Sequence, residues 1–283
     1  MPIVYIENEW NNRLRLTQNE SRWQLTGLTG LNPPPANIVT SVIPGFDGTR
    51  FNSGRLEERN VVITLALTGN AETGRMLLNN VILPKRYIKV LYRNNTLNVY
   101  IEGYVDTFEY DVFEQGIIAQ ASIICPSPYW IDVNDSDTNI KRIVDLFEFP
   151  FSIPEEGIAF SEITASASNS VINSGTVQTG IMITIEADYD VTNPTITNTT
   201  THEHMTIDMD MKKGDQIIIN TVQGNKYVEK YADDTETNII NSLTMDSNWI
   251  NVIPGENLFM AEAESGEIHM RTKITLQNRY GGV

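Results

Sequence analysis

Hydrophobic and polar positions alternate along much of this chain with a period of two residues. Val61, Ile63, Leu65 and Leu67 are apolar at every second position, and the same alternation recurs in three later segments. The four segments cover residues 61–68, 99–106, 181–187 and 268–277. A period of two indicates strands with one buried face, as in sandwiches and barrels. The sequence therefore predicts an all-β fold.

One hairpin and one helix stand out within this pattern. Residues 87–93 and 96–105 flank Asn94-Asn95, a pair that tolerates positive φ and favours a tight turn. Residues 72–83 have helical spacing, with Asn70 as a candidate cap and Pro84 as the stop. Their apolar positions are Met76, Leu77, Val81 and Leu83. We expect one short helix packed on a sheet.

A boundary between two domains is predicted near residue 134. Residues 125–130 (Cys-Pro-Ser-Pro-Tyr-Trp) end a strand, because neither proline can donate to a β-ladder. The polar stretch 132–139 is interpreted as a linker, and the aromatic residues 147–154 as extended chain. We expect domains at 1–134 and 140–283.

Charge is distributed unevenly between the halves of the chain. The net charge is −16, and residues 1–135 account for only −3 of it. Nine of the 11 cations in that half are arginine, the cation enriched in protein interfaces. The acidic balance disfavours nucleic-acid binding, and the arginine content favours assembly through the first half. Chance composition is the alternative explanation.

Residues that could carry chemistry are few. His202 and His204 would share one face of a strand and could hold a metal, but they follow a Thr/Asn-rich run, residues 193–201, interpreted as a loop, and match no zinc spacing. Cys125 as a nucleophile would need a histidine base, and all three histidines lie beyond the linker. Its register with Ile123 favours a buried thiol instead. We expect no enzyme, metal or cofactor.

Sugar binding is the stronger rival to a purely structural role. Trp249 in an acidic β-sandwich could present an aromatic platform to a glycan. Its apolar neighbours favour a position in the core. A carbohydrate-binding module therefore stays open as the alternative function.

Several separated segments, taken in order, resemble the distal tail protein of long, non-contractile phage tails. The resemblance covers essentially the whole chain. The segments are Trp23–Leu28 with Pro33–Pro35, Arg55–Leu65, the helix ending at Pro84, Glu102–Val105, Cys125–Tyr129, Phe149–Phe151, Asn173–Gly175, Thr179–Ile181 and Tyr280–Val283. The resemblance implies an amino-terminal modified β-sandwich or barrel with one short helix, which forms a homo-hexameric ring. It also implies a peripheral, galectin-like or carbohydrate-module-like sandwich.

The same resemblance implies a function in a phage or prophage-derived tail. The hexamer would join the tail tube to tail-tip and receptor-binding proteins, around a channel through which DNA passes without being bound. The protein would be made in the bacterial cytoplasm and end in the virion tail tip or baseplate. Neither catalytic residues nor a membrane partner is implied.

Arg55 and Arg59 are the candidate residues of the subunit interface. They precede the strand 61–67 and flank Glu57 and Glu58, so one short run offers both signs of charge. Fixed charges of both signs can set the register between identical subunits. A solvated strand start is the alternative interpretation of this run.

Overall fold

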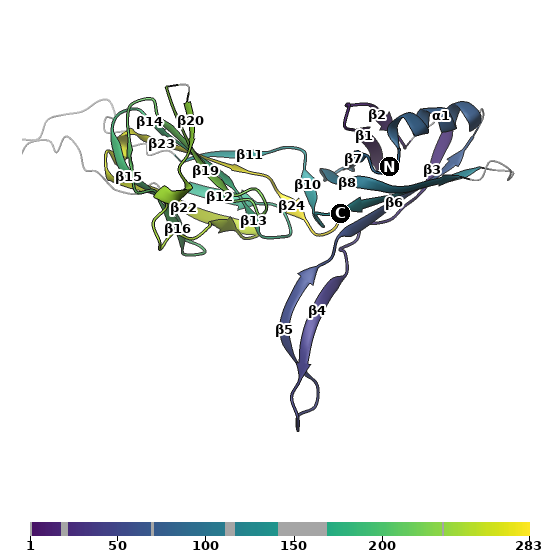
Figure 1. Ribbon diagram of the computed structural model, residues 1–283, viewed down its shortest axis with the longest axis horizontal. Coiled ribbons are helices and arrows are strands. Elements are labelled where there is room, and N and C mark those ends of the chain that lie inside the picture. Colours follow the sequence, from purple (N-terminus) through teal and green to yellow (C-terminus); the bar gives the residue numbers. More distant parts are fainter. Residues whose placement is uncertain (1, 18–21, 69–70, 111–116, 141–168, 234) are drawn as a thin grey trace, which may run out of the picture. The chain divides into compact units, whose positions relative to one another are not determined.

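The computed structural model describes residues 2–17, 22–68, 71–110, 117–140, 169–233 and 235–283 (Figure 1). The chain forms two compact units. The first comprises residues 1–134 together with 279–283, and the second comprises residues 135–278. The sequence-based division placed 279–283 in the second domain, whereas these residues pair with the first unit. The chain therefore crosses between the units twice.

The first unit is built from antiparallel strands and one helix. They are β1 (Ile3–Asn8), β2 (Arg13–Arg15), β3 (Trp23–Leu28), β4 (Ala36–Val42), β5 (Thr49–Leu56), β6 (Arg59–Leu67), α1 (Ala71–Val81), β7 (Tyr87–Arg93), β8 (Asn98–Tyr110), β9 (Ile118–Cys125), β10 (Trp130–Asp132) and β24 (Arg279–Tyr280). Seven strands pair in the order β2-β1-β7-β8-β9-β6-β3, and β10 pairs with both β8 and β24.

The core of the first unit lies between this sheet and α1. The predicted alternation in β6 is confirmed, since Val61, Ile63 and Leu65 are buried. The helix begins and ends within two residues of the predicted range, and it contributes Leu78 to the core, with Ile82 just beyond its end. Met76, which was expected on the apolar face, is exposed. The candidate cap Asn70 lies outside the described residues.

Strands β4 and β5 form a hairpin that extends away from the sheet of the first unit, and we call it the arm (Figure 1). Every residue of both strands is exposed. The connecting turn contains Gly45 and Gly48, both at positive φ (84° and 89°), a conformation that glycine adopts without strain. The arm therefore has no core of its own, and its two strands are held by backbone pairing together with a hydrogen bond from Ser41 Oγ to Asn52 Oδ1 at 3.2 Å.

The second unit is a two-sheet sandwich built from strands and two 3-10 turns. They are β11 (Ser136–Ile140), β12 (Asn169–Asn173), β13 (Thr179–Gly180), β14 (Met182–Ala187), β15 (Val191–Asn198), β16 (Glu203–Thr206), β17 (Asp210–Met211), β18 (Gln216–Asn220), β19 (Tyr227–Ala232), β20 (Thr235–Asn238), β21 (Asn251–Val252), β22 (Gly255–Ser265), β23 (Met270–Leu276) and two 3-10 turns, Ile240–Ser242 and Glu267–His269.

Two antiparallel sheets provide the core of the second unit. One has the order β11-β23-β14-β18-β19-β20, and the other has the order β12-β22-β15-β16 with β17 added to β15. Ile183, Ile185, Ile217 and Ile219 from the first sheet are buried in one cluster with Phe259 from the second. The alternation predicted for this region is confirmed, and its inward positions are the contacts between the sheets.

Three sequence-based boundaries in the second unit were wrong. The Thr/Asn-rich run 193–201 is mostly strand β15, because threonine is β-branched and Ile196 and Asn198 alternate into the interior. The expected linker 132–139 includes most of β11, which pairs with β23 and so satisfies its backbone groups. The last alternating segment starts as a strand at Met270, after a 3-10 turn. Residues 147–154 lie outside the described residues.

Candidate functional site

Arg59 is buried in the first unit, with 2% of its surface exposed. Its Nε donates to the Pro128 carbonyl at 2.8 Å, and its Nη1 donates to the Gly30 carbonyl at 2.6 Å. The remaining donors reach the carbonyls of Asn32 and Gly281. Burial lowers the pKa of Arg59 from its ordinary value, but a guanidinium stays protonated in proteins. One side chain thus joins three loops that are distant in sequence.

This position corrects the expectation that Arg59 belongs to a subunit interface. A buried guanidinium that donates four of its five N–H groups to carbonyls of its own chain is not accessible to a neighbour. The signal was present in the sequence, because Arg59 occupies the same odd-numbered register as Val61 and Ile63. Arg55 is different: it lies on β5 opposite Asn37 and is exposed. Of the two predicted interface residues, only Arg55 is available to a partner.

The C-terminal segment closes around Arg59. Tyr280 pairs with Trp130, and Val283 N–H donates to the Leu31 carbonyl at 3.0 Å. Gly282 approaches Pro33 so closely that a Cβ there would lie 2.8 Å from the proline Cδ. The segment therefore packs on the loop that leads into the arm, and Arg59 holds both.

The arm carries the largest group of exposed apolar side chains in the part of the first unit that the structure describes. Val42 is 75% exposed, Phe46 76% and Phe51 62%. Ile38, Val39 and Ile43 are also exposed on the same hairpin. Asp47, Arg50 and Arg55 are its only ionisable residues. A group of large apolar side chains that is exposed on one hairpin indicates an interaction site.

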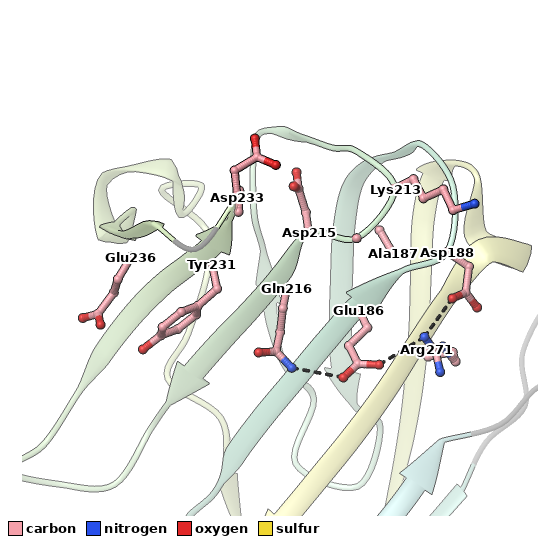
Figure 2. Close-up of a pocket in the computed structure, with 12 residues that line it drawn as sticks. Glu186, Ala187, Asp188, Lys213, Asp215, Gln216, Tyr231, Asp233, Glu236 and Arg271 are labelled. Carbon is pink, nitrogen blue, oxygen red and sulfur yellow. Dashed lines mark hydrogen bonds and ion pairs between the residues drawn. The ribbon is translucent and has the colours of Figure 1, made fainter.

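A polar cleft of about 750 Å³ lies at one end of the six-stranded sheet of the second unit (Figure 2). Its lining residues come from β14, β18, β19, β20 and β23 and from the loops that follow or precede these strands. They are Glu186, Ala187, Asp188, Lys213, Gly214, Asp215, Gln216, Tyr231, Ala232, Asp233, Glu236 and Arg271. None of them was singled out as a site residue from the sequence, because they are scattered over 86 positions and share no local motif.

Five of these residues form one row across five adjacent strands. Arg271 pairs with Glu186, Glu186 with Gln216, Gln216 with Tyr231, and Tyr231 with Glu236. Figure 2 shows the five side chains following one another across the outer face of the sheet. Cross-strand partners on one face are close enough to interact directly, so the sheet register itself aligns these polar groups.

Hydrogen bonds and ion pairs hold most of the row in place. Gln216 Nε2 donates to Glu186 Oε1 at 3.0 Å. Arg271 Nη2 lies 3.3 Å from Glu186 Oε2 and 2.8 Å from Asp188 Oδ1. Desolvation and a hydrogen bond to Glu229 raise the pKa of Tyr231 to about 12, so its hydroxyl is a donor at neutral pH.

The rim of the cleft is held by Asp215. Its carboxylate accepts from the Lys212 N–H at 2.8 Å and lies 2.7 Å from Lys230 Nζ. Desolvation opposes the charge on Asp215, but these two contacts outweigh it and lower the pKa of the carboxyl group. Within the described residues, no cation pairs with Asp233 or Glu236. The five lining carboxylates outnumber the two lining cations, which leaves a formal charge of −3.

The histidines are not brought together. His202 precedes β16 in a turn with φ of 59°, so it does not share a strand face with His204. His204 Nε2 lies 3.2 Å from Asp246 Oδ2, and the His269 ring packs on Tyr189 at 4.8 Å between centroids. Throughout the residues that the structure describes, no three His, Cys, Asp or Glu side chains gather as a metal site.

Trp249 packs against the core of the second unit and is only half-buried. Lys226 Nζ lies 5.0 Å from the centroid of its ring. The core interpretation of this residue is therefore confirmed, and Trp249 does not line the cleft.

None of the helices in the described residues is both long and apolar enough to span a bilayer.

Cys125 is expected to be inert in the folded protein. It is fully buried, and burial raises the pKa of its thiol to about 12, so the reactive thiolate is scarce at neutral pH. We expect a water-soluble aromatic disulfide to modify it at least about a hundredfold more slowly in buffer than in denaturant. Complete modification of the native protein within minutes would contradict this buried position.

Part of the chain is similar to a known protein family. Residues 174–280 match the family model of the siphovirus-type tail component, C-terminal domain. No curated protein sequence matches the chain significantly.

Solved structures extend the likeness of fold to the whole chain. The crystal structure of the Dit protein of phage SPP1, described as a paradigm of the hub adsorption apparatus in phages that infect Gram-positive bacteria, superposes with a TM-score of 0.68 at 12% identity, over 98% of each chain. A chain of the phage P2 baseplate in its activated conformation with Ca gives 0.51 at 10% identity, over 97% of this chain and 98% of that one. The corresponding structure with Sr gives 0.50 at 10% identity, over 98% of both.

Proposed function

We propose that this chain, whose residues 174–280 match the model of a siphovirus-type tail component, is a structural hub subunit of a phage tail tip or baseplate. In this proposal six copies form a ring through their first units, and the second units lie on its periphery. The ring joins the tail tube to the tail-tip and receptor-binding proteins. The role is structural and needs no catalytic step or cofactor.

The observation that carries this proposal is the exposed arm. A ring requires that one surface of a subunit complement a different surface of its neighbour. An arm with Val42, Phe46 and Phe51 on its surface is unfavourable in water and is stabilised when a second copy covers it. We assign the next subunit as its partner. Arg55, on the same hairpin, supplies a charged contact to that subunit.

Charge supports the same division of roles. The first unit has 12 cations against 13 anions, whereas the second unit has a net charge of −15. A nearly neutral unit can pack against copies of itself without strong repulsion, and the acidic unit stays solvated. A channel without a basic lining also lets DNA pass, because phosphate contacts with Lys and Arg are what hold nucleic acid.

Native mass spectrometry and negative-stain imaging of the purified full chain test the proposal. We expect six-membered rings at micromolar concentration, alone or after addition of the neighbouring tail proteins. A monomer in dilute solution is compatible with a ring that forms on a template. A stable dimer as the largest species, even with the tail proteins present, would refute the hexamer.

A further inference from the structure

We propose that the polar cleft of the second unit binds a non-anionic saccharide. This goes beyond the hub function, because the ring needs no ligand on this sheet. The cleft combines an open volume of about 750 Å³ with side chains that are already aligned by strand pairing. A site whose groups are held before the ligand arrives loses less conformational freedom on binding.

The hydrogen-bonding inventory of the cleft selects the ligand. Its five carboxylates are acceptors only. Among the lining donors, one Nε2–H of Gln216 and Arg271 Nη2 are already directed to Glu186 and Asp188, the Tyr231 hydroxyl donates to Glu229, and Lys213 Nζ lies 5.1 Å from the centroid of the Tyr189 ring. The cleft therefore presents a surplus of acceptors. A ligand rich in hydroxyl donors satisfies them, and a saccharide carries such donors on most of its ring carbons.

The negative charge of the cleft further restricts the class of saccharide that it can bind. The lining has a formal charge of −3, and Asp233 and Glu236 have no cationic partner among the described residues. An anionic polymer would be repelled at these carboxylates. A saccharide without phosphate, sulfate or carboxylate groups avoids this repulsion, and an amine on the sugar would add an attractive contact.

Tyr231 provides the apolar component. It is half-buried on β19, in the middle of the row between Gln216 and Glu236 (Figure 2). The C–H face of a pyranose can pack on an aromatic ring while the hydroxyls at its edge reach neighbouring polar side chains. The alternation of Gln, Tyr and Glu along one row offers both kinds of contact at the spacing of adjacent strands, about 4.8 Å.

A glycan array probed with the full chain, followed by calorimetric titration of the best ligand, tests the proposal. The probes include maltohexaose, chitohexaose, a fully deacetylated chitosan hexamer and heparin. We expect binding to at least one uncharged or amine-bearing saccharide with a Kd of roughly 0.1–1 mM per site, and none to heparin. In the proposed six-membered ring, six such sites would raise the apparent affinity of the protein for a surface that carries many copies of the saccharide.

Two variants locate the site. Glu236→Gln and Gln216→Ala are expected to weaken binding about tenfold or more, since each removes hydrogen-bonding partners of the sugar. Glu256→Gln makes the same charge change on the exposed face of β22 in the other sheet and is the matched control. Failure of every saccharide to bind, equal binding by heparin, or equal loss in the control variant overturns the proposal. Ring formation is measured separately, so this failure leaves the hub function unaffected.

Discussion

Replacing Arg59 with alanine is expected to destabilise the first unit by at least about 3 kcal/mol. The substitution removes the hydrogen bonds that the buried guanidinium donates to the carbonyls of Gly30, Pro128 and Gly281, and hydrogen bonds to a charged group contribute about 1.5–3 kcal/mol each. Arg59→Lys should lose nearly as much, because an ammonium cannot reproduce the planar fork that reaches three loops. Denaturant unfolding followed by tryptophan fluorescence measures the change, since Trp130 is buried beside this cluster.

Arg55→Ala is the matched control for this measurement. It removes the same side chain four residues earlier, from an exposed position on the arm, so stability should change by less than about 0.5 kcal/mol. Similar stabilities for the Arg55 and Arg59 variants would show that the buried hydrogen bonds contribute little. If Arg59→Ala does not fold, the lysine variant supplies the comparison.

Replacing Val42, Phe46 and Phe51 together with serine is expected to abolish ring formation and leave the subunit folded. Burial of each side chain against a neighbour contributes about 1.5 kcal/mol or more, so the three together weaken association roughly a thousandfold. All three are exposed within the chain, so the unfolding midpoint should stay unchanged. Native mass spectrometry over a concentration series gives the association constant.

A second variant, Met76→Ser with Met245→Ser, removes exposed apolar side chains away from the arm and should assemble like the parent. Rings that persist in the arm variant at the parental concentration would contradict the proposed subunit contact. Equal loss of assembly in both variants would point to a general effect of surface hydrophobicity.

Periodicity was sufficient to predict the β-rich fold, because inward positions such as Val61 and Ile183 repeat at the period that a sandwich imposes. Periodicity did not predict β15, because its threonines and asparagines are polar. Threonine nevertheless favours a strand because it is β-branched, and the side chain of Asn198 is buried. Arg59 was misjudged for a similar reason. Its register with Val61 and Ile63 indicates an inward position, but the carbonyls that pair with the buried guanidinium come from three loops that only the fold brings together.

The cleft could not be predicted from sequence at all. Its row joins Glu186 to residues as distant as Arg271, and only the pairing of β14 with β18 and β23 brings these positions together. Strand order in an antiparallel sandwich depends on long-range contacts, which leave no signal in local spacing. The arm was not predicted either, because the exposure of its apolar strands becomes apparent only when the fold shows that no described sheet or helix packs on them.

The chain leaves the first unit at residue 134 and returns to it at residue 279, and this connectivity makes the second unit separable from the first. Ile131 and Arg279 are Cα partners in one antiparallel ladder, so the whole second unit occupies the position of a hairpin turn in the first. A turn of about two to five residues could replace it without disturbing the sheet. The second unit is therefore an exchangeable cassette, and a different domain joined at residues 134 and 279 would leave the first unit, with the subunit contacts proposed for it, intact.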